Sequence, residues 1–421
     1  MTARSRVGIS TTEWSGAGPA GSGWDAAGVV RKVGLGERRA RLAVRHRLVP
    51  AERTDDVVAL TDGLGALHST DPVTVYLSTA ARMRTAGLTA LENALYTDRS
   101  LVRHHAMRRT LWVLGRDTAR AAHLATTLDL LRVQRKLVLG MLEAGGIAEP
   151  ESWLAAVGAE IVELLAETGP LTAREIGARL PAAAVPVPVG SGKFATTQAA
   201  HSRVLLVLGF EGRVVRARPT GSWINGQYRW AAATSWFPGG FDDPDPDPRR
   251  AAAELARRWL WTFGPGTRTD LQWWAGWTVA TTKRALADVD AVEVDLDDGP
   301  GYLLPDDVDE VDDPGPSTAL LPGLDPSTMG WKQRGFHLDP AHVPTLFDRN
   351  GNGGPTAWVD GRIVGGWAQR RDGEIVLRLL DDVGADAQAA LLHQAQQLWA
   401  LLGEVRFTPR FPAPLRAELL R

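Results

Sequence analysis

The feature that most constrains the fold of this chain is an order of patterns that recurs along it: helix, turn, helix, a longer helix and a pair of strands. The clearest copy lies in residues 150–240, where Thr172 and Glu175 have the spacing of a capping box that begins a short helix. Val214–Ala217 and Tyr228–Ala231 are then expected to pair across a glycine-containing turn. This order is typical of a winged helix, and we predict three such units, although no repeat is visible in the residues themselves.

The first unit is predicted for residues 37–149, after a disordered leader at residues 1–36 that is rich in glycine, serine and alanine. Three short helices separated by tight turns form its expected helix-turn-helix core, and the third begins at Asp71-Pro72, with Asp at N-cap and Pro at N1. Residues 101–114 are interpreted as two strands with basic and imidazole side chains between them. A long helix is expected from Asp117 to Ala144.

Alternating aspartate and proline in residues 242–248 exclude a helix or a central strand there and mark a boundary. The second unit therefore ends near residue 240, and the third is predicted for residues 241–316. Within the second unit we interpret the Pro/Val-rich residues 185–189 as a linker or loop, and residues 197–210 as helical.

From residue 317 the patterns change to short strands, followed by a helix at 385–402 and a final strand near Val405-Arg406-Phe407. These patterns predict a C-terminal β-barrel-like domain over residues 317–421. The fold class expected for the whole chain is α+β, with three tandem winged-helix modules and this C-terminal domain.

Composition narrows the possible functions. The chain has no cysteine, which excludes a disulfide scaffold, a zinc finger, a cysteine nucleophile and an iron–sulfur centre. Residues 1–30 lack the apolar core of a signal peptide, and no run of about 18 apolar residues is present, so we expect a soluble protein of the cytoplasm. Residues 1–150 hold 21 Lys/Arg against 14 Asp/Glu, and residues 286–330 hold 13 acids and no base. The N-terminal third is therefore the part suited to a polyanion.

The most informative polar cluster is His68-Ser69-Thr70, directly before the helix that begins at Asp71-Pro72. Free N–H groups and the positive end of the helix dipole favour an anion or an oriented water at such a place. A purely structural interpretation is also open, with Asp71 as a cap, Thr70 as a turn residue and His68 as a half-buried filler. The histidines form no spacing typical of a metal site, and we expect neither a metal nor a cofactor.

Four stretches together resemble the winged-helix DNA glycosylases of the AlkZ and YcaQ type. They are Gly63–Pro72 with Ala80-Ala81-Arg82, Met107–Val113 with Asp117, Thr269–Trp274, and Leu320–Pro326 leading to Gly330–Arg334. The resemblance covers roughly residues 38–421. It implies three winged helices and a C-terminal β-barrel around a concave DNA-binding face, in an enzyme that removes alkylated purines from DNA.

The sequence departs from this family at the catalytic motif. Where the family has Gln-x-Gln or Gln-x-Asp, the matching positions here are His68 and Thr70. Our hypothesis is that these two side chains hold and activate the water of a monofunctional DNA glycosylase acting on N7- or N3-alkylated purines, bulky adducts and interstrand crosslinks included. An imidazole with an ordinary pKa of about 6.5 would serve as a base near neutral pH, and the rate would then fall on acidification. The alternative is a non-catalytic, regulatory winged-helix DNA-binding protein in which the altered motif marks lost activity.

The expected partner is double-stranded DNA containing alkylated purines, bound by a monomer associated with the nucleoid. Arg108 and Arg109 in the first unit, and Lys332 and Arg334 near the C-terminal domain, are predicted to bind phosphates, with Ser69 as a further DNA contact.

Overall fold

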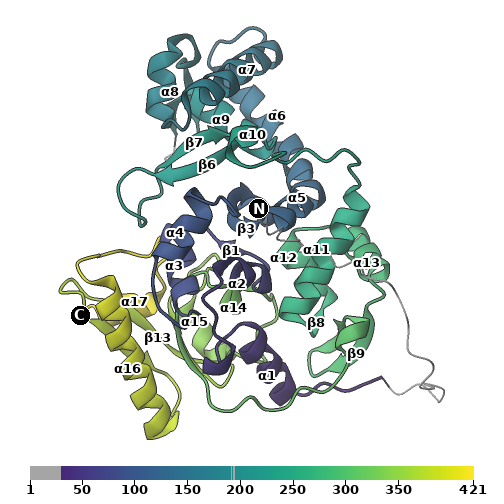
Figure 1. Ribbon diagram of the computed structural model, residues 1–421, viewed down its shortest axis with the longest axis vertical. Helices are drawn as coiled ribbons and strands as arrows, with labels where there is room; N and C mark the ends of the chain where they lie inside the picture. The colour runs from purple at the N-terminus through teal and green to yellow at the C-terminus, as the bar shows by residue number, and fades with distance from the viewer. Residues whose placement is uncertain (1–29, 191, 193–194) are drawn as a thin grey trace, which may run out of the picture.

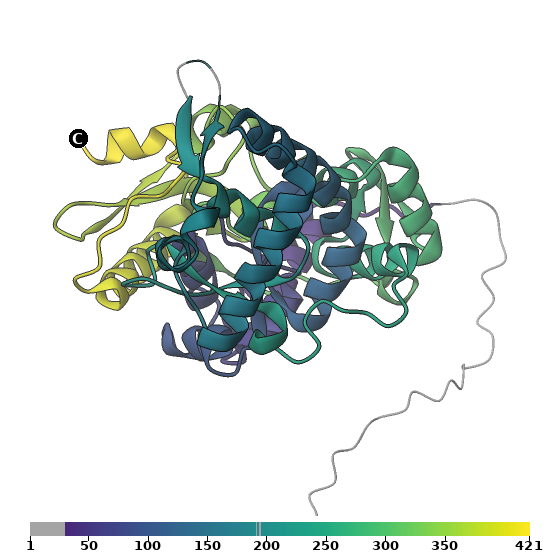
Figure 2. The same ribbon diagram turned by 90° about the horizontal axis from the view of Figure 1, so that it is seen from above.

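The computed structural model describes residues 30–190, 192 and 195–421. The second unit forms one end of the molecule, and the other units lie together at the opposite end (Figure 1). One hydrophobic core joins the first unit, the third unit and the C-terminal part and also includes Val215 and Trp236 of the second unit. The helices of the second unit have a separate core built around Ile161 and Val204. The C-terminal helices and the third unit lie on opposite sides of the molecule in both views (Figures 1 and 2).

The first unit consists of short helices and a three-stranded antiparallel sheet, confirming the strand pair expected at residues 101–114. The sheet has the order β1-β3-β2. The elements are α1 (Leu35–Arg45), α2 (Val57–Gly63), β1 (Leu67–His68), α3 (Pro72–Ala80), α4 (Thr89–Tyr96), β2 (Leu101–His105) and β3 (Leu111–Gly115). The predicted leader lies largely outside the described residues, and its last part, from Val30, runs beside the third unit, where Val33 is fully buried.

A long helical segment leads from the first unit to the second, as the sequence indicates. It consists of α5 (Arg116–Ala122), a π-helical stretch (His123–Thr127) and α6 (Leu128–Ala144). The helices of the second unit are α7 (Pro150–Thr168), α8 (Ala173–Arg179), α9 (Ala200–Phe210) and α10 (Ala233–Trp236). The capping box of Thr172 and Glu175 at the start of α8 is confirmed.

Two interpretations within the second unit were wrong. Residues 185–189 are not a loop, because β4 (Pro186–Val189) pairs with β5 (Thr196–Ala199), and the latter replaces the start of the expected helix. The prolines are tolerated because this sheet has only two strands, so each strand has an unpaired edge. The hairpin of β6 (Val214–Pro219) and β7 (Tyr228–Ala232) forms as expected.

The third unit follows the predicted order. Its helices are α11 (Pro248–Phe263), α12 (Arg268–Ala275) and α13 (Val279–Asp288). They are followed by a hairpin of β9 (Val292–Leu296) and β10 (Gly299–Leu303), and β8 (Gly266–Thr267) completes a sheet of order β8-β10-β9.

The C-terminal part contains an open sheet and no closed barrel in the described chain, which corrects the expected β-barrel-like domain. The sheet order is β11-β12-β13-β14, so β11 and β14 are edges and do not pair with each other. The strands are β11 (Thr318–Leu321), β12 (Thr356–Val359), β13 (Arg362–Gln369) and β14 (Ile375–Leu379). The helices are α14 (Pro326–Met329), α15 (Val343–Leu346), α16 (Gly384–Leu402) and α17 (Pro414–Leu419), and α16 packs across β11 and β14.

The final strand expected near residues 405–407 is absent from the described structure. The side chain of Gln369 takes the place of a strand partner: its Nε2 donates to the carbonyl of Val405 at 2.9 Å, and its Oε1 accepts from the N–H of Phe407 at 3.2 Å. The stretch from residue 403 to residue 413 is therefore an extended loop tied to the end of β13.

Candidate functional site

The turn between β1 and α3 carries His68, Ser69 and Thr70, and the sheet fixes its position. His68 is paired with Trp112 of β3, and the N–H of Ser69 donates to the carbonyl of Leu111 at 2.7 Å. The helix start is confirmed, because Asp71 caps α3 by accepting from the N–H of Val73 and Pro72 occupies the first turn. The backbone of the motif is thus held by β3 on one side and by α3 on the other.

The His68 ring is 5% exposed and lies 4.6 Å from the ring of Trp112. Burial, together with the nearby Arg108 cation, lowers the pKa of His68 to about 3. The expectation of a base that titrates near neutral pH was therefore wrong: the imidazole is neutral throughout the physiological range. Its Nδ1 accepts a long hydrogen bond (3.4 Å) from the N–H of Thr70, and this assignment places the ring proton on Nε2, which is then a donor.

The hydroxyl of Thr70 is unsatisfied within the part of the chain that the structure describes. The Oγ1 atom is buried and has no hydrogen-bond partner among the described residues. An unsatisfied buried hydroxyl costs about 1–3 kcal/mol, so this atom is suited to a water or a ligand atom. The carbonyl of Thr70 accepts from the guanidinium of Arg410 at 3.1 Å, which brings the C-terminal loop onto the motif.

Ser69 is buried, as His68 is, whereas Thr70 is half-buried. Ser69 is 1% exposed, and its Oγ accepts from Nε of Arg103 at 3.1 Å. The structure therefore places the predicted DNA contact of Ser69 in the interior, where the serine orients an arginine of β2.

The predicted cations Arg108 and Arg334 meet at one aromatic ring. The Arg108 guanidinium lies 4.0 Å from the ring centre of Trp273 in α12, and that of Arg334 lies 5.3 Å from it. Burial lowers the pKa of each arginine to about 10, with Arg334 contributing to the shift at Arg108, so both remain charged near neutral pH. Because Arg108 also affects the pKa of His68, the motif and the two cations belong to one region.

The turn between β2 and β3 has an unusual backbone that positions Arg108. Arg108 and Arg109 both have positive φ, 56° and 61°, a conformation that side-chain-bearing residues rarely adopt. The turn lies against Gly276, just after α12, where a Cβ would be 3.4 Å from the Arg108 backbone nitrogen, and the φ of 76° at Gly276 favours glycine. Arg109 and Lys332 are exposed and take no part in the Trp273 cluster.

Trp273, Arg103 and Arg410 are not among the site residues expected from the sequence. A signal for Trp273 existed, because tryptophans in neighbouring positions of one helix cannot all face the same side. Trp274 and Trp277 are indeed buried, whereas Trp273 receives the two cations. The roles of Arg103 and Arg410 depend on tertiary contacts, which a single sequence does not encode locally.

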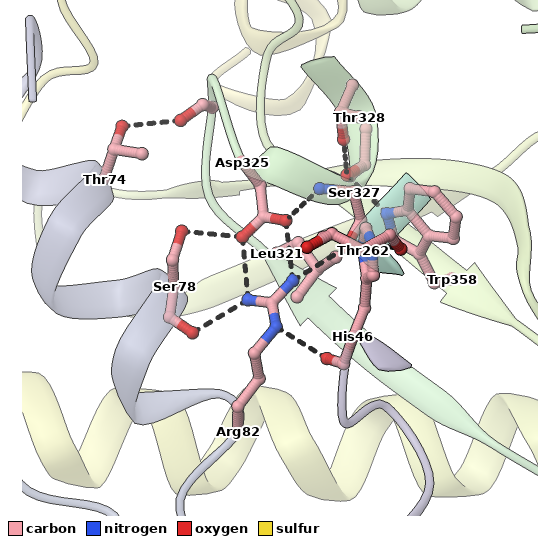
Figure 3. Close-up of polar contacts among 12 residues, drawn as sticks. His46, Thr74, Ser78, Arg82, Thr262, Leu321, Asp325, Ser327, Thr328 and Trp358 are labelled. Atoms are coloured by element: carbon pink, nitrogen blue, oxygen red, sulfur yellow. Dashed lines mark hydrogen bonds and ion pairs between the residues drawn. The ribbon is translucent and has the colours of Figure 1, made fainter. Parts of the chain in front are cut away.

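A buried ion pair clamps the opposite end of α3 to the C-terminal part (Figure 3). The guanidinium of Arg82 donates to both carboxylate oxygens of Asp325, at 2.7 and 2.9 Å, and both side chains are fully buried. Ser78 donates to the same carboxylate at 2.6 Å, and Thr74 donates to the carbonyl of Gly323 at 2.6 Å. The helix that follows the motif is therefore held along its length against the loop before α14.

Within residues 30–190, 192 and 195–421, no group of three or more His, Cys, Asp or Glu side chains is arranged to hold a metal ion. In the same part of the chain, no helix combines the length and the apolar character needed to cross a membrane.

Comparison with known proteins adds two findings. The model of the family described as "DNA glycosylase AlkZ-like" matches residues 61–401. Among solved structures, the fold is similar to that of the Streptomyces sahachiroi DNA glycosylase AlkZ, with a TM-score of 0.65 and 19% identity over 88% of this chain and 98% of that chain. No curated protein matches. At this identity the structural likeness supports the fold, and the family match supports the kind of activity.

Proposed function

This chain belongs to the AlkZ-like DNA glycosylase family, and on that premise we propose that it releases N7- or N3-alkylated purines from double-stranded DNA with His68 and Thr70 at the reacting sugar. A DNA glycosylase is a hydrolase of N-glycosidic bonds, so the family fixes the reaction type. The substrate and the residues that carry out the reaction are the content of the proposal.

The chemistry requires little acid catalysis. An N7-alkylguanine or N3-alkyladenine carries a positive charge, so its bond to C1′ is weakened, and the base leaves as a neutral molecule that keeps the bonding electrons. The sugar becomes oxocarbenium-like, and water adds to C1′ and gives its proton to solvent. The enzyme needs to hold that water in line with C1′ and to stabilise the developing charge.

A neutral His68 and the Thr70 hydroxyl suit this task. The ring Nε2–H donates to the oxygen of the water, and the Thr70 Oγ1 accepts one of its protons. The pKa of about 3 keeps His68 uncharged, so no imidazolium repels the cationic base or the oxocarbenium-like sugar. His68 therefore acts by orienting the water, as the glutamine of the family motif does by hydrogen bonding, and not as a strong base.

The cations beside the motif bind the DNA backbone. Arg108 and Arg334, stacked on Trp273, and the exposed Arg109 and Lys332 bind backbone phosphates. The recurring order of helices and hairpins favours three tandem winged-helix modules, with boundaries near residues 37, 150 and 241, and a C-terminal part from residue 317. We place the duplex along the face shared by these modules, bound by a monomer, with bulky N7 adducts and interstrand crosslinks included among the substrates.

The single observation that carries the proposal is the buried hydroxyl of Thr70, which has no hydrogen-bond partner among the described residues and lies two residues from His68 in a turn fixed by β3 and α3. The test is single-turnover excision of 7-methylguanine from a duplex, followed by alkaline cleavage at the abasic site. Replacing His68 or Thr70 by Ala should slow excision by about 100-fold. This is the lower end of the rate effect that a side chain positioned at the reacting water contributes.

The matched control is His342→Ala, a half-buried histidine that pairs with Asp381 in the C-terminal part. It should leave the rate unchanged. Unaltered excision by both His68→Ala and Thr70→Ala would remove these residues from the mechanism. Tight binding of the methylated duplex by the wild-type chain without any alkali-labile product would remove alkylated purines from the proposal.

A further inference from the structure

Two arginines at the junction of the first and second units carry charge that no carboxylate neutralises among the described residues. Arg103 of β2 is 2% exposed; it donates to Ser69 and to the Tyr96 hydroxyl, and its Nη2 has no partner in the described chain. Arg216 of β6 donates to Nε2 of His105 at 3.0 Å and lies 4.6 Å from the ring centre of Trp230. All of these partners are neutral groups.

Two acids of neighbouring elements are already engaged. Glu92 accepts from the Tyr76 hydroxyl and pairs with Arg218, and Glu175 pairs with Arg229 at 3.0 Å while closing the capping box of α8. Removing a charge from water costs several kcal/mol unless an opposite charge compensates it. The cluster of Arg103 and Arg216 therefore requires an anion that the described chain does not supply.

A cavity of about 610 Å³ lies at this cluster, and we call it the hairpin pocket. Its lining combines donors from the β6–β7 hairpin and from the start of α8: Thr172, Arg174, Arg216, Thr220, Gln227 and Tyr228. The Tyr228 hydroxyl is buried and has no hydrogen-bond partner among the described residues. The pocket is thus cationic and rich in donors, and one of its lining residues, Tyr228, has a hydroxyl without a hydrogen-bond partner among the described residues.

The hairpin pocket is next to the motif. The Arg103 side chain that contacts Ser69 also lies 4.8 Å from the ring centre of Tyr228. On the hairpin, a Cβ placed on the pocket residue Gly226 would lie 3.6 Å from the ring of Pro72, the first residue of α3. An anion in the pocket would therefore lie close to a sugar held at His68 and Thr70.

We propose that the hairpin pocket binds a phosphodiester of the DNA backbone beside the damaged nucleotide, with Arg216 as the ion-pairing residue and Tyr228 as a hydrogen-bond donor. This inference rests on the proposed function, because it takes the DNA strand at the motif as given. The fork of a guanidinium matches two phosphate oxygens, and the pocket has room for the adjoining sugars.

The test is a scan of backbone charge on the full-length chain. A duplex with a tetrahydrofuran abasic-site analogue is prepared with each phosphodiester near the lesion replaced in turn by a neutral methylphosphonate, and affinity is measured by fluorescence anisotropy. With wild-type protein, one or two replacements beside the lesion should weaken binding about tenfold, as expected for one charge-assisted contact. With Arg216→Gln, binding of the unmodified duplex should weaken about tenfold and these positions should lose their effect.

Arg229→Gln is the matched control, because it removes one positive charge from the neighbouring strand at a residue already paired with Glu175. It should keep the wild-type pattern of sensitive positions. Tyr228→Phe removes a single hydroxyl and guards against misfolding of the arginine variant; it should weaken binding of the unmodified duplex severalfold. Arg216→Gln and Tyr228→Phe proteins that both bind as the wild type does would overturn the inference.

Titration with inorganic phosphate, followed by ³¹P line broadening, separates a DNA phosphate from a free anion. Saturable binding that requires Arg216, together with a flat methylphosphonate scan, would assign the pocket to a free anion and overturn the DNA assignment. The scan measures binding to an abasic product analogue, so its outcome is independent of excision. A sensitive scan without excision contradicts only the proposed function, and a flat scan with normal excision contradicts only this inference.

Discussion

The backbone N–H of Arg410 donates to the carboxylate of Asp71 at 2.8 Å, so the loop after α16 is fastened to the turn that carries His68 and Thr70. Asp71 also caps α3 through its other carboxylate oxygen. One buried side chain thus joins the start of α3 to a segment near the C-terminus.

Asp71→Ala should remove both contacts and lower the free energy of unfolding by about 1–2 kcal/mol, the usual cost of losing an N-cap. Asp71→Asn keeps an acceptor for the cap, so its free energy of unfolding should fall by less than that of Asp71→Ala. Urea unfolding of both variants checks this order, and an alanine variant as stable as the wild type would contradict it.

The rate of excision should be flat between pH 5 and pH 8. His68 has a pKa of about 3, so its protonation state does not change in that range. The check is the single-turnover rate at several pH values with the chemical step limiting. A rate that falls on acidification with a midpoint near 6.5 would show that the imidazole titrates as an exposed one does.

Stability, in contrast, should fall on acidification. A histidine with a lowered folded-state pKa binds its proton in the unfolded chain first, so its contribution is complete above about pH 6.5 and is lost progressively toward pH 3. Burial lowers the pKa of both His68 and His46 to about 3, so each should contribute about 1.4 kcal/mol per pH unit over that window. Chemical unfolding at pH 7, 6 and 5 measures the slope, and His68→Ala should reduce it.

Removing one partner of the buried ion pair of Arg82 and Asp325 should destabilise the fold strongly. Asp325→Ala leaves the guanidinium uncompensated and should lower the free energy of unfolding by about 3–5 kcal/mol. The exposed pair of Arg132 and Asp129 provides the comparison, and Asp129→Ala should cost less than about 1 kcal/mol. Equal losses in the two variants would contradict the role of burial.

Arg109 and Lys332 are exposed, and their contribution to DNA binding should be electrostatic only. Arg109→Gln and Lys332→Gln should each reduce the salt dependence of duplex binding, plotted as log affinity against log salt, by about one unit. Undamaged and methylated duplexes should be affected alike. An unchanged slope would place that residue away from the DNA.

Local patterns in the sequence predicted the helices and hairpins best where caps and turns are explicit. Asp71-Pro72 and the capping box at Thr172 mark their helices correctly, because these signals depend on a few neighbouring residues. Pro186–Val189 was misassigned because its strand character comes from pairing with Thr196–Ala199. A barrel was predicted where the sheet is open, because closure depends on contacts between distant edges, which local patterns do not show.

The candidate site shows the same division. His68 and Thr70 were singled out because they match the family motif, and Arg108 and Arg334 because of their charge, and the roles of all four stay predictions. The inward turn of Ser69 and the pKa of His68 depend on burial, and the role of Trp273 depends on two arginines from separate segments. None of these can be read from a local pattern.

The side chain of Gln369, which takes the place of a strand partner at Val405 and Phe407, has a consequence for how the C-terminal loop is attached. The guanidinium of Arg406 adds hydrogen bonds to the carbonyls of Arg371 and Asp372. The segment that leads to Arg410 is therefore fastened through side chains, so its attachment depends on the identity of Gln369 and Arg406, whereas a paired strand would be held by its backbone whatever its sequence.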